Sequence, residues 1–566
     1  MENHLKLTNA ERFAQTLYKN GVRYIFGQSN PQTIMLASEA IGIKQIGFRQ
    51  ENAGAYMAQG YGMISQKVPV VAAQNGPAAT LLVPGLAEAL KSSHAMVAIV
   101  DDVPLSDEDR NAFQELDQVS LFQGVSKWTK KINSPARIEE LVDRAFIEAA
   151  SGKPGPVVLL CPKDIFYDTT KNEVTYSNEE SYSSYPLDRP VSNIEQIKKA
   201  VELISKSSSP LIYAGGGVNT SGASDILKKI QEEFSIPVAT TTMGKGTVDE
   251  NHPLTIGPIG YYMGKRGRTK FLKEFVQESD LILLIGNRTN QNGTDTWSLL
   301  PKDATYIHID IDHSEIGRNY SSLRLLGDAK ATLDVLYYYL TTENYKNAAK
   351  NIAVEKIANA RQKHKVEVNE IIEQKHTKLR IEQFMENINN VLDDDHIIVS
   401  DASFSSIWTA NYIDAYNQRK FIFPRGLAGL GWGLPMAMGS KLAANKKVFC
   451  LSGDGGFAHV WSELETCNRE GIDVVIAVIN NTVLGYQKHA EVAKWGKHTS
   501  ACILNQVDYV KIAEACDIKG IRIDSTDNLE EKLEEAMHHK GSVLIDLIID
   551  PDCIPPLPFM EPLETV

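Results

Sequence analysis

Two apolar runs in the last third of the chain, residues 448–451 and 474–479, constrain its fold more than any other feature. Small and polar residues follow each run: Leu451-Ser452-Gly453-Asp454-Gly455-Gly456 and Asn480-Asn481. Uninterrupted apolar runs of this length are typical of strands buried in a parallel sheet. A helix is predicted between them, over residues 458–469. Both strands then end at the same edge of the sheet, where such folds bind ligands.

Asp454 and Asn481 are therefore expected to meet at that edge. Their carboxylate and amide oxygens suit a Mg²⁺ ion that is also held by a diphosphate. The glycines allow backbone N–H groups at a helix N-terminus to approach phosphate oxygens. The alternative is a glycine-rich turn and a surface asparagine turn that bind no ligand. A magnesium–diphosphate cradle accounts for both the acid and the asparagines, so it is the prediction.

Length and composition limit the number of domains, the kinds of partner and the location that this chain can have. A chain of 566 residues indicates about three or four domains, and 43% hydrophobic with 23% charged residues is typical of globular proteins. The net charge of −13 argues against nucleic acid as a partner. The 6 cysteines form no CxxC pair, so neither a disulfide framework nor a zinc site is indicated. The sequence has no signal-type apolar core and no apolar run of about 18 residues, so we expect a cytoplasmic enzyme without membrane contact.

A second candidate site lies near the N-terminus. There a strand over residues 46–48 leads to Glu51, at the start of a helix rich in small residues. The helix dipole alone favours an acid at this place. The segments around Asp454 and Asn481, however, resemble the thiamine diphosphate motif, and enzymes with that cofactor need a carboxyl group against its aminopyrimidine ring. A partly desolvated glutamate shares a proton with the ring nitrogen, and we predict this role for Glu51.

With both sites in place, the chain resembles acetolactate (acetohydroxyacid) synthase large subunits over nearly its whole length. The resemblance is carried by Gly27, Glu51, residues 60–62 (Gly-Tyr-Gly), 76–77 (Gly-Pro), 112–115 (Ala-Phe-Gln-Glu), 307–312 (Ile-His-Ile-Asp-Ile-Asp), 327–329 (Gly-Asp-Ala) and 431–435 (Gly-Trp-Gly-Leu-Pro). It implies an α/β fold of three doubly wound parallel-sheet domains. These are a pyrimidine-binding domain over residues 1–168, a central nucleotide or FAD-type domain over residues 193–345 and a diphosphate-binding domain over residues 377–566. It also implies a homodimer or homotetramer with active sites at the subunit interface.

The resemblance also implies roles for single residues. The catalytic candidates are Glu51, Gln114 and Lys127. A turn glutamine and a solvated lysine are the structural alternatives for the last two. The cofactor-binding candidates are Glu51, Asn75, Gly76, Ala428, Leu430, Gly453, Asp454, Gly455, Gly456 and Asn481. The metal-binding candidates are Asp454, Asn481 and Val483, and the substrate-pocket candidates are Gln28, Ser29, Asn30, His489 and Ala490. Leu430 is expected to wedge between the two cofactor rings, where relatives usually have Met.

The central domain departs from the family pattern. Relatives hold FAD there without using it for redox chemistry, and residues 286–288 fit their Gly-x-Arg segment. Residues 289–292 (Thr-Asn-Gln-Asn), however, replace the usual Phe-Asp-Asp-Arg, and Tyr262 replaces a flavin-contacting histidine. The assignment of FAD therefore stays open, and we predict that it binds weakly or not at all.

The implied reaction is thiamine-diphosphate-dependent formation or cleavage of a C–C bond in a 2-oxo acid. The first expectation is an acetolactate synthase-like carboligase that decarboxylates pyruvate and joins it to a second small-molecule carbonyl substrate. Several residues expected at the pocket differ from the family: residues 28–31 (Gln-Ser-Asn-Pro) replace a Pro-Gly-Gly segment, Gln50 replaces His, Asp101-Asp102 replaces Gly-Gln, and Ala490 replaces the Trp that selects the acceptor.

Because of these departures, a lyase, decarboxylase or carboligase acting on another ketone, diketone or aldehyde is the main alternative. Two alternatives come from other classes, a catalytically silent thiamine diphosphate binder and a nucleotide-dependent oxidoreductase. The intact Glu51 argues against the silent binder. The glycine-rich segment over residues 211–217 lacks the spaced third glycine of a dinucleotide fingerprint, which argues against the oxidoreductase.

Overall fold

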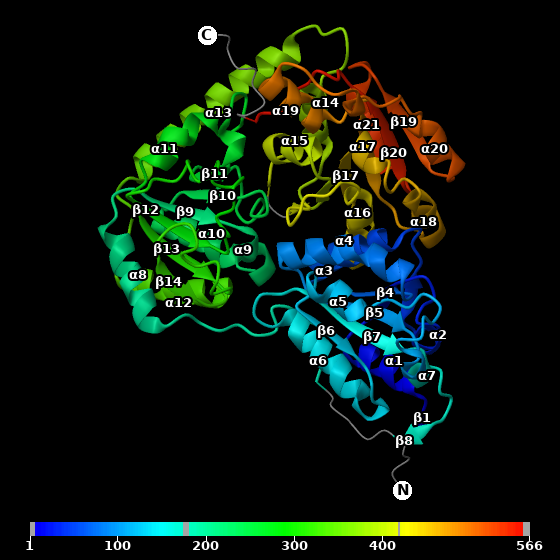
Figure 1. The fold of residues 1–566 in the computed structure, drawn as a ribbon. Helices are drawn as coiled ribbons and strands as arrows, with labels where there is room; N and C mark the ends of the chain where they lie inside the picture. Colours follow the sequence, from blue (N-terminus) through cyan, green and yellow to red (C-terminus); the bar gives the residue numbers. More distant parts are fainter. Residues whose placement is uncertain (1–5, 174–179, 417–418, 558–566) are drawn as a thin grey trace. The chain divides into compact units, whose positions relative to one another are not determined.

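The computed structural model describes residues 6–173, 180–416 and 419–557. This part of the chain contains three six-stranded parallel sheets with helices between the strands, so the predicted α/β fold class is confirmed (Figure 1). The chain divides into two compact units. Unit 1 comprises Met1–Asp188, Pro424–Asn445 and Val460–Val474, and unit 2 comprises Arg189–Phe423, Lys446–His459 and Val475–Val566. Two segments from the last third of the sequence therefore belong to the unit that contains Glu51.

The sheet of unit 1 has the strand order β3-β2-β4-β5-β7-β6. Its strands are β2 (Tyr24–Phe26), β3 (Lys44–Ile46), β4 (Val70–Ala73), β5 (Met96–Asp102), β6 (Trp128–Lys131) and β7 (Pro156–Pro162). Its helices are α1 (Asn9–Lys19), α2 (Gln32–Ala40), α3 (Glu51–Ser65), α4 (Pro77–Ser92), α5 (Gln118–Gln123), α6 (Ile138–Ala150), α7 (Lys163–Phe166), α16 (Gly433–Ala443) and α18 (Glu463–Glu470). A separate antiparallel pair joins β1 (Lys6–Leu7) to β8 (Asn172–Glu173). Every residue of β5 and β7 is buried, as expected for inner strands of a parallel sheet covered on both faces.

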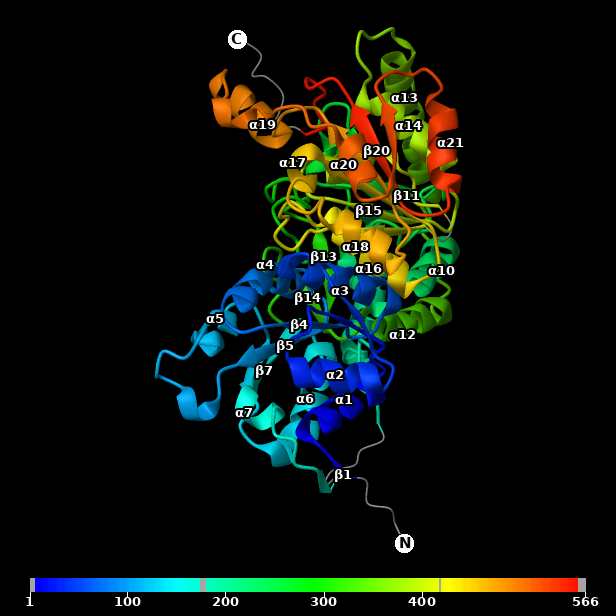
Figure 2. The same cartoon turned by 90° about the vertical axis from the view of Figure 1, so that its right-hand side faces the viewer.

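Helices α3 and α16 lie side by side in unit 1 (Figure 2), and small residues bring their backbones close together. A Cβ at Gly60 would stand 2.2 Å from the Met436 carbonyl oxygen, and a Cβ at Gly439 would stand 1.8 Å from the Met57 carbonyl oxygen. No side chain fits into such a space, so glycine is required at both positions. This contact explains why the helix that begins at Glu51 is rich in small residues.

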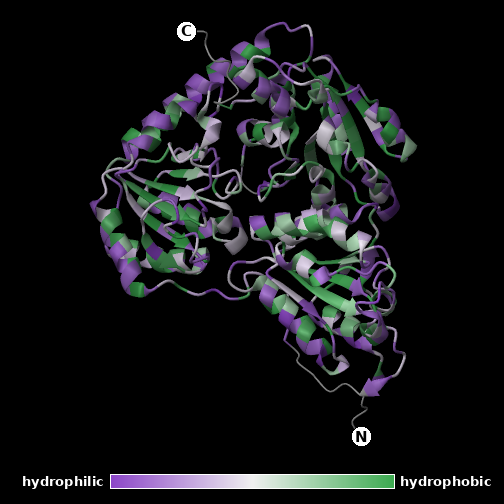
Figure 3. Cartoon of the chain, in the orientation of Figure 1, coloured by the Kyte–Doolittle hydropathy of each residue, from purple (hydrophilic) through white to green (hydrophobic). Residues whose placement is uncertain are grey.

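The central sheet belongs to unit 2 and has the order β11-β10-β9-β12-β13-β14. Its strands are β9 (Pro210–Ala214), β10 (Val238–Thr240), β11 (Thr255–Pro258), β12 (Leu281–Ile285), β13 (Thr305–Asp310) and β14 (Leu323–Leu326). The helices of this part are α8 (Ile194–Lys206), α9 (Gly216–Ser221), α10 (Ser224–Phe234), α11 (Lys273–Gln277), α12 (Ala329–Thr342) and α13 (Lys350–Glu373). Hydrophobic residues concentrate on the strands, whereas α13 is largely hydrophilic (Figure 3).

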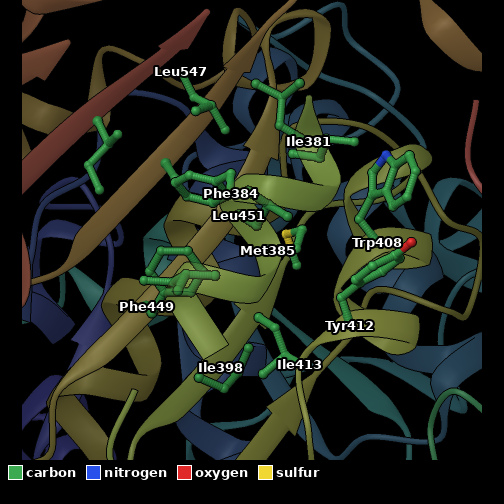
Figure 4. Close-up of a cluster of buried hydrophobic side chains, with 14 of the residues drawn as sticks. Ile381, Phe384, Met385, Ile398, Trp408, Tyr412, Ile413, Phe449, Leu451 and Leu547 are labelled. Atoms are coloured by element: carbon green, nitrogen blue, oxygen red, sulfur yellow. The ribbon is translucent and has the colours of Figure 1, made fainter. Parts of the chain in front are cut away.

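The third sheet also belongs to unit 2 and has the order β16-β15-β17-β18-β20-β19. Its strands are β15 (Ile397–Ser400), β16 (Lys420–Ile422), β17 (Val448–Gly453), β18 (Val475–Asn480), β19 (Lys519–Ile523) and β20 (Val543–Ile548). Its helices are α14 (Ile381–Val391), α15 (Phe404–Tyr412), α17 (Asp454–Phe457), α19 (Gly485–Trp495), α20 (Tyr509–Ala515) and α21 (Leu529–His538). Phe384 and Met385 of α14 lie in one hydrophobic core with Phe449 and Leu451 of β17 (Figure 4).

The two apolar runs form neighbouring parallel strands, with Leu451 of β17 opposite Ala477 of β18, as predicted. The helix predicted over residues 458–469 is wrong in its first half. Four helical residues at Asp454–Phe457 are followed by turns, and α18 begins only at Glu463. The chain passes from unit 2 into unit 1 between residues 459 and 460, and turns make this passage where a continuous helix was expected.

No helix in the described ranges is long and apolar enough to cross a membrane.

Candidate cofactor site

The predicted magnesium–diphosphate site lies in unit 2, at the carboxyl ends of β17 and β18. Asp454 follows β17 directly and is the first residue of α17. Its Oδ2 accepts a hydrogen bond from the Thr482 N–H at 2.8 Å, and its Oδ1 accepts one from the Gly455 N–H at 2.8 Å. The Asp454 carboxylate is thus tied to the turn that contains Asn481, and the structure brings the two segments together.

The surroundings of Asp454 fit a bound cation. The residue is 6% exposed, and burial raises the pKa of its carboxyl group to about 6. The groups that lower this pKa are backbone N–H groups rather than basic side chains. Among the described residues, no cluster of three or more His, Cys, Asp or Glu side chains offers a different metal site. One carboxylate and one amide are donors that suit Mg²⁺ when phosphate oxygens complete its coordination.

The glycines around Asp454 serve two purposes. A Cβ at Gly453 would meet only Ser405 Oγ, at 3.8 Å, an ordinary contact distance, so no neighbouring atom crowds this side of the residue. A Cβ at Gly455 would stand 2.7 Å from the end of the Leu484 side chain, which would have to move aside. Gly456 follows, buried within α17. The uncrowded side of Gly453 fits the expected approach of a phosphate group to the backbone.

The two asparagines that end β18 have different environments. Asn480 is buried, and its amide donates hydrogen bonds to Asp546 Oδ1 and to the Val507 carbonyl oxygen, both at 2.8 Å. Asn481 lies in the following turn, where its Oδ1 accepts the Val483 N–H at 3.3 Å. Asn480 is therefore structural, and Asn481 and Val483 are the members of this segment at the sheet edge.

Glu51 lies in unit 1 as the first residue of α3, just beyond the carboxyl end of β3. Gln50 is the N-cap of this helix, but its side chain makes no capping hydrogen bond. The Arg49 and Gln50 N–H groups donate instead to Glu463 Oε1, at 2.9 and 3.2 Å. Sequence reasoning did not single out Glu463, because it lies 413 residues from Gln50 in a segment that reads as an ordinary helix.

The loop before α16 is held by another buried glutamate that the sequence did not reveal. Glu88 of α4 is 0% exposed, and its Oε1 and Oε2 accept the Gly426 and Leu427 N–H groups at 2.6 and 2.5 Å. Farther along this loop, Ala428 has a φ of +61°, and Leu430 is half-buried. The proposed insertion of Leu430 between two cofactor rings stays a prediction, and Glu88 is the group that holds the start of its loop.

Gln114 lies beside Asn75 and Gly76, at the carboxyl end of β4. The buried Asn75 amide donates to the Gln114 carbonyl oxygen at 3.0 Å, and the Gln74 amide donates to Gln114 Oε1 at 2.8 Å. Gly76 has a φ of +68°, and a Cβ there would stand 2.7 Å from the Gln114 carbonyl oxygen, so glycine is required. The structure therefore brings these three predicted residues together.

Lys127 does not join them. It precedes β6 and so lies at the amino edge of the sheet, opposite the edge where Asn75 lies. Its ammonium group donates to the carbonyl oxygens of Glu148 and Ser151, at 2.5 and 2.9 Å, where α6 ends. A cation at this place is favoured by the helix dipole. The observed contacts are those of a helix cap away from the edge that holds Asn75, and a catalytic role for Lys127 stays a prediction.

The predicted pocket residues of unit 1 follow β2. Gln28 Nε2 donates to the Phe48 carbonyl oxygen at 2.5 Å, and Asn30 Nδ2 donates to the Gln28 carbonyl oxygen at 3.3 Å. Ser29 has a φ of +61°. This polar loop therefore contains an internal hydrogen bond, and it also contacts the segment that leads to Glu51.

The predicted pocket residues of unit 2, His489 and Ala490, lie on α19. The His489 ring stacks on Phe404 with centroids 5.8 Å apart, and burial lowers the pKa of this histidine. Ala490 packs against the hydrophobic core of the third sheet. Both side chains contact the protein interior, and a role for them in binding an acceptor stays a prediction.

Two buried acids end β5, at the same edge as Asn75. Asp102 forms an ion pair with Lys131 at 2.8 Å. Asp101 Oδ2 has no hydrogen-bond partner within the described ranges, and burial raises the pKa of Asp101 to about 7 although Lys163 lowers it. Lys163 also donates to Asn75 Oδ1 at 3.1 Å. The edge that holds Gln114 and Asn75 therefore includes an acid that titrates near neutral pH.

The carboxyl edge of the central sheet bears on the FAD prediction. A Cβ at Gly215 would stand 2.2 Å from the Gly286 carbonyl oxygen, and a Cβ at Gly217 would stand 2.6 Å from Gly286 Cα. Contact between two loops thus requires these glycines without any nucleotide. Tyr262 is 1% exposed, and its hydroxyl accepts a hydrogen bond from Thr242 at 2.9 Å. Its ring joins the hydrophobic core of the third sheet, a position that suits packing.

Comparison with known proteins agrees with this geometry. Three family models match the chain. They are described as the N-terminal TPP binding domain, the central domain and the C-terminal TPP binding domain of thiamine pyrophosphate enzymes, and they match residues 7–121, 197–336 and 401–547. The first and last of these matches include Glu51 and Asp454.

Curated relatives cover most of the chain. A probable acetolactate synthase large subunit of Methanococcus aeolicus is 34% identical over 89% of this chain and 85% of the relative. The protein of that name in Methanocaldococcus jannaschii is 33% identical over 98% and 94%, and the acetolactate synthase of Arthrospira platensis is 30% identical over 97% and 96%. The chain therefore belongs to the thiamine-diphosphate-dependent enzymes of the acetolactate synthase large-subunit family, which make C–C bonds.

Proposed function

We propose that this enzyme joins two molecules of pyruvate to form one acetolactate and one CO₂. One observation carries the proposal: the two residues predicted to hold opposite ends of the cofactor lie where they were expected. Glu51 is the first residue of α3, and Asp454 accepts a hydrogen bond from the turn that contains Asn481. The names of the relatives support the choice of pyruvate as donor and acceptor. When bound, thiamine diphosphate supplies an electron sink for the bond that breaks next to the donor carbonyl.

The residues of this chain would bind and orient the reactants. Asp454 and Asn481, with the Val483 carbonyl oxygen, would hold Mg²⁺ and through it the diphosphate. Glu51 would hold a proton at the aminopyrimidine nitrogen. Leu430 would keep the two cofactor rings in a bent arrangement. Gln114, whose backbone contacts Asn75, would face the carbonyl substrate.

We further propose that the enzyme is an oligomer. The relatives' names describe large subunits, which supports an oligomeric enzyme. A homodimer or homotetramer would place Glu51 of one subunit and Asp454 of another at the same cofactor. A cytoplasmic location stays a prediction from the sequence. FAD is expected to be weak or absent, so the purified enzyme should lack the visible absorbance of a stoichiometric flavin.

A second candidate function is carboligation with bulkier or hydroxylated carbonyl compounds as acceptors. The observation that favours it is the polar character of the edge of unit 1, where Gln28, Ser29, Asn30 and Asp101 take the places of smaller or less acidic family residues. An apolar wall of the size of an indole contributes about 1–3 kcal/mol of discrimination between neighbouring substrates. Ala490 lacks this wall. We therefore expect no preference for 2-oxobutyrate over pyruvate as acceptor.

Product analysis tests both candidates. The enzyme is incubated with thiamine diphosphate, Mg²⁺ and a panel of 2-oxo acids, diketones and aldehydes, and CO₂ and all carbonyl products are quantified. Equal amounts of acetolactate and CO₂ from pyruvate support the first candidate. Release of free aldehyde or acid without any condensation product contradicts it and favours a lyase or decarboxylase. A strong preference for 2-oxobutyrate in competition with pyruvate contradicts the second candidate.

A further inference from the structure

The segment that leads to Glu51, residues 44–50, is held by side chains of α18. Glu463 is 0% exposed, and its Oε1 accepts both the Arg49 and Gln50 N–H groups. Its Oε2 accepts the Thr466 hydroxyl at 2.8 Å. All these residues belong to unit 1. A single carboxylate thus takes the two N–H groups that immediately precede Glu51.

This contact lies just before the first turn of α3. A Ser, Thr, Asp or Asn side chain at the N-cap usually accepts the second or third N–H group of a helix. The N-cap here is Gln50, whose side chain makes no such bond. Glu463 accepts the N–H group of the N-cap itself and that of Arg49 before it, from a segment remote in sequence. The contact thus fixes the backbone at the point where α3 begins.

Other α18 contacts lie at the rim of the same segment. Arg469 donates to the Gly47 carbonyl oxygen at 2.6 Å, and Lys44 pairs with Glu470 at 2.9 Å. Glu465 pairs with the Arg49 side chain at 2.8 Å, with exposed fractions of 33% and 52%. Exposed pairs of this kind contribute little, because water screens them. They offer a matched control for the buried contact on the same helix.

We propose that Glu463 is a positioning residue for Glu51: by accepting the Arg49 and Gln50 N–H groups, it fixes where α3 begins and therefore where the Glu51 carboxyl group lies. The inference rests on the role of Glu51 in the proposed function. It predicts that the effects of Glu463 on catalysis pass through Glu51 and disappear when Glu51 is already disabled.

The test measures hydrogen–deuterium exchange at C2 of bound thiamine diphosphate by NMR, which needs no substrate. Glu463→Ala and Glu463→Asp should slow exchange at least about tenfold, because neither side chain reaches both N–H groups. Glu463→Gln keeps an acceptor oxygen at the same reach and should stay within about threefold of the wild type. Glu465→Gln, the exposed control, should be unchanged. Calorimetry and circular dichroism establish that each variant binds the cofactor and is folded.

The double variant Glu51→Gln/Glu463→Asp decides between positioning and general structure. If Glu463 acts through Glu51, the double variant exchanges no more slowly than Glu51→Gln alone. The inference would be overturned if the double variant slowed exchange by the product of the two single effects. Exchange at the wild-type rate in the folded Glu463→Asp variant would also overturn it. Failure of the proposed function shows separately: unchanged exchange in Glu51→Gln removes Glu51 from the mechanism, and absent acetolactate with normal exchange removes only the substrate assignment.

Discussion

The two ends of the predicted cofactor site are built in different ways. In unit 2, the N–H groups that bind Asp454 lie 1 and 28 residues away in the sequence. In unit 1, the carboxylate that binds the Gln50 N–H lies 413 residues away, and the one that binds the Leu427 N–H lies 339 residues away. Contacts close in sequence build the first end, whereas long-range packing of buried glutamates builds the second. Substitutions should therefore affect the two ends differently.

The largest effect is expected at the diphosphate end. Asp454→Ala removes the one carboxylate of the predicted Mg²⁺ site, so affinity for thiamine diphosphate with Mg²⁺ should fall by at least about 100-fold. Isothermal titration calorimetry measures it, with the exposed Asp527→Ala as the matched control. Wild-type affinity in Asp454→Ala would show that the cofactor is held elsewhere.

At the other end, Glu51→Gln should separate binding from chemistry. The amide cannot share a proton with the ring nitrogen, so C2 exchange should slow by about 10²-fold or more, while cofactor affinity stays within about threefold. NMR measures the exchange rate and calorimetry the affinity. An unchanged rate would mean that Glu51 has only the helix-dipole role common to such acids.

Glu88 offers a test of the long-range support at the loop before α16. Glu88→Ala leaves the Gly426 and Leu427 N–H groups without their acceptors. The free energy of unfolding should therefore fall by about 1–3 kcal/mol. Cofactor affinity should also fall, by about tenfold, because the loop that carries Leu430 must then be ordered when the cofactor binds. Glu88→Gln keeps one acceptor and should lose less. If both variants bind and unfold like the wild type, the loop does not depend on this contact.

Asp101 gives the smallest expected effect, seen in the pH dependence of stability. Burial raises its pKa from 3.8 to about 7, so between these values the folded chain binds a proton that the unfolded chain releases. The contribution of this group to the free energy of unfolding therefore falls as pH rises from about 4 to about 7, and is constant above. Asp102 raises this pKa further and Lys163 opposes it.

Asp101→Asn carries no such proton. Its melting temperature relative to the wild type should therefore rise with pH across that range and then level off. Thermal unfolding followed by circular dichroism between pH 5 and 8 measures the difference. Parallel melting curves for the two proteins would mean that Asp101 is ionised throughout, compensated by Lys163.

The sequence predicts the features built from local contacts and misses those built from long-range contacts. The β17 and β18 strands, the Asp454–Asn481 edge and the placement of Glu51 at a helix start all rest on patterns a few residues long, and the structure agrees with them. Glu88 and Glu463 escaped detection because an isolated glutamate in a helix has no local sign of a remote partner.

Two other expectations depend on long-range arrangement. The helix over residues 458–469 was predicted from local propensity, which does not show that the chain changes units there, and its first half is wrong. Lys127 was assigned from the resemblance alone, and the sheet places it at the edge opposite Asn75, so its catalytic role stays a prediction. Local sequence shows neither the change of unit nor the edge at which a residue lies.

The central claim is that Glu51 and Asp454 serve one cofactor, contributed by different subunits. Co-expression of Glu51→Gln and Asp454→Ala chains tests it directly, because a mixed dimer then has one site with both residues intact and one with neither. Random pairing should restore acetolactate formation to about a quarter of the wild-type rate, although each variant alone is nearly inactive. No recovery in verified mixed dimers would contradict the account, since it would place both residues of each site on the same chain.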